Sequence, residues 1–136
     1  SSVPADTARD EPVEKLFQSA RILAAERQFE EAREVLATVL NIEPTNREAR
    51  ALLRELRADH LAELYQQVPP HRTPLLTVST DHLKGLELSP RETYLASRLD
   101  GRWDVATLVM TTPLSELDTL RALHKFLHAG IVKFRE

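Results

Sequence analysis

Two histidines, His124 and His128, have a spacing that could hold a metal ion. They are four residues apart in a segment that we expect to be helical, so their side chains would lie on one face, one turn apart. The residues between them, Lys125 to Leu127, are not those of a zinc-protease helix, and no acidic third ligand is obvious. We therefore interpret the pair as part of a half-exposed helix surface and expect no metal site.

The remaining polar residues argue against catalysis. No catalytic motif occurs, and each of the three glycines, Gly85, Gly101 and Gly130, falls at the end of a predicted element rather than in a phosphate-binding loop. The carboxylates lie mostly on predicted solvated helix faces, where an acid–base pair is not expected. The absence of cysteine excludes thiolate zinc sites and cysteine nucleophiles. We expect no enzyme, no catalytic residue and no cofactor.

The length and charge of the chain limit its domain count and the class of partner that it can bind. The 136 residues allow one ordinary domain or two small ones. Residues 1–68 carry 9 Lys/Arg and 13 Asp/Glu, and residues 69–136 carry 9 and 8. Neither half has the clustered positive charge that drives binding to nucleic acid, so nucleic acid is not the expected partner.

Nothing in the sequence predicts a membrane protein. No apolar run approaches the roughly 20 residues of a membrane span, and no signal peptide is recognisable. The lack of cysteine fits a reducing compartment, so we expect a cytoplasmic protein. Because the chain starts with Ser1 and Ser2 and not with methionine, we interpret it as a piece of a longer polypeptide.

The first half of the chain predicts a helical hairpin and a third helix. Residues 1–11 are polar and aperiodic and are expected to be disordered. Apolar residues then recur at three- and four-residue steps, which predicts helices over Pro12–Glu26 and Phe29–Leu40. The two-residue joint between them allows only an antiparallel turn. Asn46 would cap a third helix over Arg47–Gln66, which would cover the apolar face of the hairpin.

The hairpin from Val13 to Asn46 resembles a tetratricopeptide repeat (TPR) of 34 residues. Its signature positions hold Ala20, Leu23, Phe29, Ala32, Leu36 and Pro44. Two positions depart from the pattern, because Leu16 replaces the tryptophan and Arg27 replaces a glycine.

The TPR resemblance implies a concave face that binds a protein or peptide. This face would present Glu14, Phe17, Gln18, Arg21, Glu48, Ala51 and Glu55. An exposed Phe17 beside Arg21 would suit a peptide contact. The alternative is that Phe17 packs under a preceding repeat or the N-terminal segment.

The second half predicts a proline-rich hinge and a small second domain. Three prolines within Val68–Pro74 exclude a helix and favour extended chain. Short strands are predicted over Leu75–Val78 and Ile131–Phe134, and they could pair with each other. Between them, three helices begin at the capping residues Ser89, Asp104 and Ser115. The first of these would turn Tyr94, Leu95 and Leu99 inward.

Three short helices and a strand are the layout of a winged helix-turn-helix. The segment Leu88–Val132 resembles the small winged-helix-like module of bacterial proteins that also carry TPRs or J-domains. The residues that carry the resemblance are Leu88-Ser89-Pro90, Ser97-Arg98-Leu99-Asp100-Gly101, Pro113-Leu114 and Leu120–Gly130. The resemblance implies a fold and a bacterial context, and no activity.

A winged helix could contact DNA or protein. A recognition helix reads DNA with its first turns, but here those turns carry Glu116 and Asp118, which phosphates repel. The candidate contact surface consists of Arg102, Trp103, Arg121, Lys125, His128 and Lys133. Within it, Trp103 could be a binding hot spot, but we favour a core residue that anchors the turn between two helices.

These observations predict a mainly α protein in four parts. They are a disordered lead-in (1–11), a TPR-like hairpin with a capping helix (12–67), a hinge (68–74) and a winged-helix-like domain with a short strand pair (75–136).

The expected function is that of a non-catalytic adaptor or scaffold, which docks a protein or peptide within a larger bacterial regulatory or chaperone-associated protein. The alternatives are a DNA-binding transcriptional regulator that uses the winged helix, and an inert spacer that positions an attached catalytic domain. The sequence identifies neither the partner nor the oligomeric state.

Overall fold

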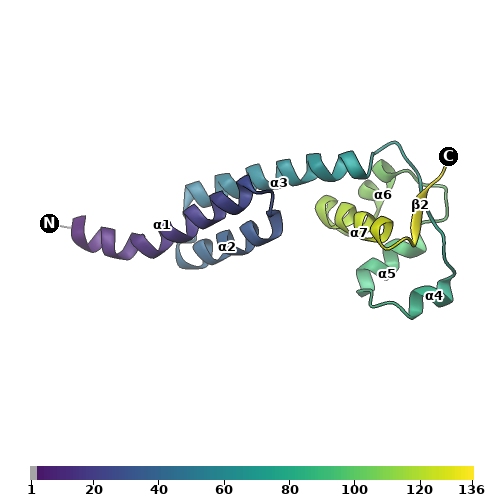
Figure 1. Ribbon diagram of the computed structural model, residues 1–136, viewed down its shortest axis with the longest axis horizontal. Helices are drawn as coiled ribbons and strands as arrows, with labels where there is room; N and C mark the ends of the chain where they lie inside the picture. Colours follow the sequence, from purple (N-terminus) through teal and green to yellow (C-terminus); the bar gives the residue numbers. More distant parts are fainter. Residues whose placement is uncertain (1–2) are drawn as a thin grey trace. The chain divides into compact units, whose positions relative to one another are not determined.

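The chain folds into two compact units, one that ends at His60 (unit 1) and one that begins at Leu61 (unit 2). The computed structural model describes residues 3–136, with side chains from residue 11 onward. Within these residues the chain is mainly helical and has one small antiparallel sheet (Figure 1). None of the helices described here combines the length and the apolar character that crossing a bilayer requires.

Unit 1 contains α1 (Val3–Ala25), α2 (Phe29–Ile42) and the first part of α3 (Arg47–Gln67). Helices α1 and α2 lie side by side as a hairpin (Figure 1). The turn depends on Arg27, whose φ of 60° lies in the left-handed region. The N–H of Arg27 donates to the carbonyl of Ala24 at 3.0 Å, and that of Gln28 donates to the carbonyl of Leu23 at 2.8 Å. These are the two bonds of a Schellman helix ending, in which glycine is the usual left-handed residue.

The core of unit 1 draws on all three helices. Its buried members are Val13, Phe17, Ala20, Phe29, Ala32, Leu36, Val39, Ala49 and Leu56. Ala20 and Ala32 are fully buried, and their small side chains let α1 and α2 approach closely. As predicted, Asn46 caps α3, because its Oδ1 accepts from the N–H of Ala49 at 2.9 Å.

Helix α1 begins earlier than the sequence suggested. It starts at Val3 and continues through Pro12, where the expected helix began. The segment predicted as disordered, residues 1–11, is therefore helical from Val3 on, and Ser1 and Ser2 lie outside the described residues. A proline inside a helix removes one N–H donor, and its ring crowds the carbonyl four residues earlier. This weakens or kinks a helix but does not always end it.

Unit 2 consists of the end of α3 followed by four helices and two strands. In chain order these are β1 (Pro74–Leu76), α4 (Thr80–Lys84), α5 (Pro90–Ser97), α6 (Val105–Thr111), α7 (Glu116–His128) and β2 (Val132–Phe134). Strands β1 and β2 pair in antiparallel register, with Leu75 opposite Lys133. The predicted pairing of the two strand segments is therefore confirmed.

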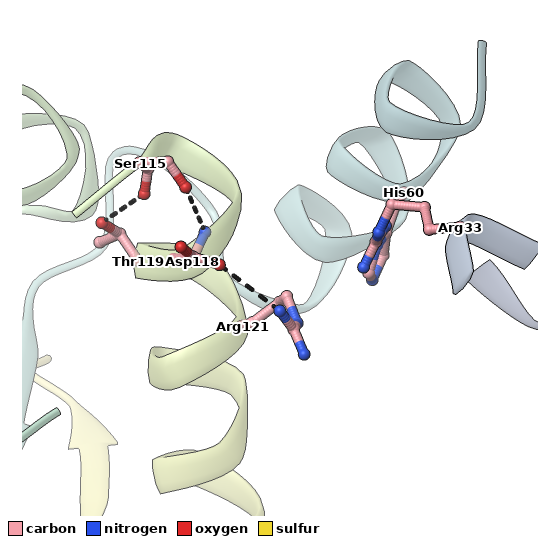
Figure 2. A network of polar contacts seen from close by, with 6 residues as sticks. All are labelled: Arg33, His60, Ser115, Asp118, Thr119 and Arg121. Carbon is pink, nitrogen blue, oxygen red and sulfur yellow. Dashed lines mark hydrogen bonds and ion pairs between the residues drawn. The ribbon is translucent and has the colours of Figure 1, made fainter. Parts of the chain in front are cut away.

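The three predicted helix starts in unit 2 are also confirmed. Ser89 and Glu92 form a complete capping box, with bonds of 3.1 and 2.9 Å. Asp104 accepts from the N–H of Thr107 at 2.8 Å. Ser115 accepts from the N–H of Asp118 at 3.1 Å (Figure 2). These bonds satisfy amide donors that have no partner within their own helix.

The segment Pro70–Thr77, which we call the spine, connects most elements of unit 2. The carbonyls of Pro70 and Arg72 accept from the first two N–H groups of α6, at 3.0 and 2.9 Å. The carbonyl of Thr73 accepts from Arg135 at 2.7 Å. On the strand side, Leu76 donates to Leu99 at 3.1 Å and Thr77 donates to Ile131 at 2.9 Å.

The expectation of a hinge over residues 68–74 is therefore wrong. Val68 is fully buried in the core of unit 2, and Arg72 lies 4.8 Å from the ring centroid of Phe134. The compact units divide within α3, between His60 and Leu61, and not at the prolines. Proline does exclude helix here, as predicted, but extended chain can still be bonded firmly through its carbonyls.

The end of α3 is held in unit 2 by burial and by one strong hydrogen bond. Leu64 and Val68 are buried in the same core as Leu95, Leu99, Leu108, Leu120, Leu123 and Phe126. The hydroxyl of Tyr65 donates to Glu116 Oε2 at 2.6 Å. Burial and the neighbouring Glu116 carboxylate raise the pKa of Tyr65 to about 12.

Alanine substitutions at the three glycines should differ sharply in cost. Gly101 has a φ of 84°, and an added Cβ would lie 3.2 Å from Leu75 Cδ1. Gly130 has a φ of 75° but open space around it, and Gly85 has an ordinary backbone. We expect Gly101→Ala to lower the free energy of unfolding by about 2 kcal/mol, Gly130→Ala by about 1 kcal/mol and Gly85→Ala by almost nothing. Urea unfolding of the three variants measures this order, and equal effects at Gly101 and Gly85 would contradict it.

Candidate functional site

The loop between α5 and α6 is fixed at both ends by the spine. At its start, Asp100 forms an isolated antiparallel bridge with Leu75. At its end, Val105 donates to the carbonyl of Arg72 at 2.9 Å. Between these ties, Gly101 supplies a left-handed turn, with φ of 84°. The position of Trp103 in this loop is therefore set by backbone bonds on both sides.

Trp103 lies at the surface and not in the core. Its side chain is 37% exposed, so the interpretation of Trp103 as a core anchor is wrong. The physical reason is that the hydrophobic residues on either side of it, Leu99 and Val105, already fill the core at this end of unit 2. Trp103 lies between these two residues in the sequence, but its side chain stays at the surface while theirs are buried.

Tyr94 of α5 and Arg98, the C-cap residue of that helix, extend this exposed aromatic surface. The guanidinium carbon of Arg98 lies 5.6 Å from the ring centroid of Trp103. Arg98 Nη1 also donates to the hydroxyl of Tyr94 at 3.3 Å. Tyr94 is 42% exposed, so the prediction that it turns inward is wrong. We call these three residues the Tyr94–Arg98–Trp103 cluster.

The cluster has the side chains of a binding surface. A guanidinium over a tryptophan ring is attracted by the ring quadrupole, by about 0.5–1 kcal/mol at exposed sites. This contact restricts both side chains before any partner arrives, which lowers the entropy cost of binding. Tyrosine, arginine and tryptophan are the residue types that most often dominate binding energy at protein interfaces.

Arg102, the other residue predicted at this loop, is exposed beside the cluster. Its Nε lies 3.8 Å from Asp100 Oδ2, and its N–H donates to Asp100 Oδ1 at 3.1 Å. Both charged groups are solvated, so this ion pair contributes little to stability. Arg102 nevertheless adds a cation next to the cluster.

The predicted cations of α7 are engaged with neighbouring carboxylates. Arg121 Nη1 lies 3.4 Å from Asp118 Oδ1 (Figure 2). Lys125 Nζ lies 2.9 Å from Glu92 Oε2. Lys133 is exposed on β2. The candidate winged-helix surface is therefore partly neutralised by its own acids.

The start of α7 also pairs a cation with a carboxylate of the same helix (Figure 2). Ser115 accepts from the Asp118 N–H, and its carbonyl accepts from the Thr119 hydroxyl at 2.9 Å. The sequence places Asp118 three residues after Ser115, where a reciprocal capping box would have its acidic residue. The Asp118 carboxylate instead contacts Arg121, and aspartate is one methylene shorter than the glutamate that completes the box at Ser89.

His124 and His128 are brought together as their spacing predicted. Their Nε2 atoms lie 3.0 Å apart, and the rings meet edge to face with centroids 4.3 Å apart. Burial and the neighbouring His128 lower the pKa of His124, and the charge of Glu63 partly opposes this effect. No group of three or more His, Asp or Glu side chains in the described part of the chain is arranged to hold a metal ion.

The predicted peptide-binding face of unit 1 is exposed except at its central aromatic residue. Phe17 is only 7% exposed and packs in the core of unit 1, so of the two alternatives for this residue the exposed one is wrong. Arg21 lies 6.0 Å from the Phe17 ring centroid, and Gln18 donates to Glu14 at 2.8 Å. The exposed members are Glu14, Gln18, Arg21, Glu48, Ala51 and Glu55.

Sequence reasoning missed two groups of residues. Tyr94 and Arg98 are four residues apart on a helix that ends near the only tryptophan, and that spacing is a signal that could have identified them. In unit 1, the His60 ring stacks on Phe29 with centroids 4.7 Å apart. His60 Nδ1 lies 2.9 Å from Arg33 Nη1 (Figure 2). No local pattern links these three, because they come together only when α3 packs on α2.

Comparisons with known proteins identify no relative. The chain matches no protein-family model, no curated protein and no solved structure.

The ion pair between Glu92 and Lys125 should make stability depend on pH. Burial acts to raise the pKa of Glu92, but the Ser89 N–H and the Lys125 ammonium outweigh it, and the pKa is lowered from its usual 4.5. The stabilisation is therefore present above pH 4.5 and is lost as the pH falls through the lower folded-state pKa. We expect Glu92→Gln to cost about 1 kcal/mol at pH 7 and progressively less at acid pH, measured by urea unfolding. Glu87→Gln, at an exposed position nearby, is the control, and a Glu92→Gln effect independent of pH would refute the account.

Proposed function

We propose that this chain is a non-catalytic protein-interaction module that binds its partner through the Tyr94–Arg98–Trp103 cluster. The observation that carries the proposal is the exposed tryptophan with an arginine stacked over it. A monomeric fold has little reason to leave its only tryptophan outside the core, and aromatic anchors of this kind dominate the binding energy of interfaces.

The way the cluster is built supports this role. The loop is tied to the spine before and after Trp103, through Asp100 and Val105. Tyr94 projects from α5, which begins with a complete capping box, and Arg98 is the C-cap residue of that helix. A surface fixed by backbone bonds and by a rigid helix loses little conformational entropy on binding.

We further propose the specific folds that the sequence suggested. Unit 1 would be a TPR-like hairpin, a proposal supported by its fully buried Ala20 and Ala32 and by the left-handed turn at Arg27. Unit 2 would be a winged-helix-like domain, supported by its order of helices and by the β1–β2 pair. In this account the chain serves as an adaptor within a larger bacterial regulatory or chaperone-associated protein.

DNA binding is the competing function, and the charges of α7 weigh against it. Its first turn carries Glu116 and Asp118, and both Arg121 and Lys125 lie against carboxylates. Binding a phosphate with either cation would require breaking its ion pair or bringing phosphate close to an acid. Affinity for DNA depends on cations that can replace condensed counterions, so paired cations contribute less.

Substitution of Trp103 should strongly weaken the binding of selected peptides. Peptides would be selected from a displayed random library on the folded chain, and their affinities measured for Trp103→Ala, Arg98→Ala and Met110→Ala. Loss of a hot-spot side chain costs about 2 kcal/mol or more, so Trp103→Ala should weaken binding at least about 30-fold. Arg98→Ala should weaken it less, because it removes only the side chain that orders the tryptophan.

Met110→Ala is the matched control, because Met110 is 83% exposed and is not part of the cluster. It should leave the affinities unchanged, and circular dichroism should show all three variants folded. Peptides that bind Trp103→Ala as tightly as the unchanged chain would contradict the proposal, as would a failure to select any peptide.

The DNA alternative predicts a different result. Fluorescence anisotropy with mixed-sequence duplex DNA should show no binding at low or physiological salt. Micromolar binding that weakens steeply with salt would instead favour the DNA-binding function, and Lys133→Ala would then test whether β2 takes part.

A further inference from the structure

Helix α7 carries a second feature, independent of the cluster, in the pair His124 and His128. The two Nε2 atoms lie 3.0 Å apart, and both rings project from the same face. An uncoordinated pair at this distance needs at least one unprotonated nitrogen, because two N–H groups cannot point at each other. At least one lone pair is therefore directed into the space between the rings.

The distance between the two nitrogens also fits coordination of a single ion. Imidazole nitrogens bind divalent transition metals at about 2.0–2.1 Å. Two such bonds to nitrogens 3.0 Å apart enclose an angle of about 95° at the metal. This angle matches neighbouring positions of a tetragonal or octahedral ion and is narrower than the tetrahedral angle that zinc prefers. Cu²⁺ and Ni²⁺ are the nitrogen-binding ions with that geometry.

We infer that His124 and His128 form a two-histidine chelating site for Cu²⁺ or Ni²⁺. The remaining coordination positions belong to water or to a donor from another molecule. Among the described residues, no further His, Asp or Glu side chain joins the pair to make a group of three ligands. The site is therefore open, and its affinity depends on both histidines together.

The surroundings of the pair favour a cation. His128 is the last residue of α7, where the helix dipole and the free carbonyls are negative. Glu63, in the part of α3 that belongs to unit 2, is close enough for its charge to act on His124. The nearest cation on the helix, Lys125, is paired with Glu92.

Calorimetric titration of the tag-free chain with NiCl₂ tests the site. One ion should bind per chain, and His124→Ala and His128→Ala should each weaken binding at least about 10-fold, because each removes half of the chelate. His71→Ala and His82→Ala are matched controls, since both histidines are exposed and neither lies near another on a helix face. These controls should bind Ni²⁺ as tightly as the unchanged chain.

A second measurement locates the ion. Cu²⁺ added below one equivalent should broaden the NMR signals of α7 around residues 121–130 first, and His128→Ala should remove this effect. His128 is exposed, so the variant should remain folded. Equal Ni²⁺ affinity in the unchanged chain and in both α7 variants, or Cu²⁺ broadening centred elsewhere, would overturn the inference.

Discussion

The structure of unit 2 depends on how the backbone polar groups of the Pro70–Thr77 spine find their partners. Prolines at positions 70 and 74 remove donors and prevent a helix, so the remaining groups of this segment cannot pair with one another. They bond instead to the first residues of α6, to Leu99, to Ile131 and to Arg135. A buried backbone group without a partner costs about as much as a lost hydrogen bond, so these ties strongly favour one arrangement.

The same ties place the groups that we assign to function. The loop with Trp103 is short and is held on both sides, which keeps the ring at the surface while its neighbours Leu99 and Val105 are buried. The fold of unit 2 thus supports an exposed aromatic side chain without extending the core to cover it. The cations of α7 are directed toward carboxylates of the same unit, which reduces any attraction for a polyanion.

The sequence was most informative where structure is set locally. The starts of α5, α6 and α7 follow from Ser89, Asp104 and Ser115, because a capping side chain reaches only the next three amides. The spacing of His124 and His128 likewise placed them together, since helix geometry fixes neighbours four residues apart. The pairing of β1 with β2 was also predictable from two β-prone segments at the ends of a small unit.

Burial was harder to predict, because it depends on partners distant in the sequence. Tyr94 was assigned to the wrong side of its helix, Trp103 was assigned to the core, and the side of Phe17 was left open. A large aromatic residue does not itself indicate which other side chains fill the available space. The proline-rich segment was taken for a hinge because its composition excludes a helix. Its carbonyls remain full acceptors, and their partners, in α6 and beyond β2, lie 33 or more residues away.

Amide hydrogen exchange of the free chain, followed by NMR, is the most direct test of this account. The central claim is that the spine is an integral part of unit 2 that holds the Trp103 loop in place. It predicts that the amides of Leu76, Val105 and Arg135 exchange as slowly as those in the middle of α7, because all open only when unit 2 unfolds. Fast exchange at these three amides, with α7 still protected, would show that the segment is a mobile linker and would contradict the claim.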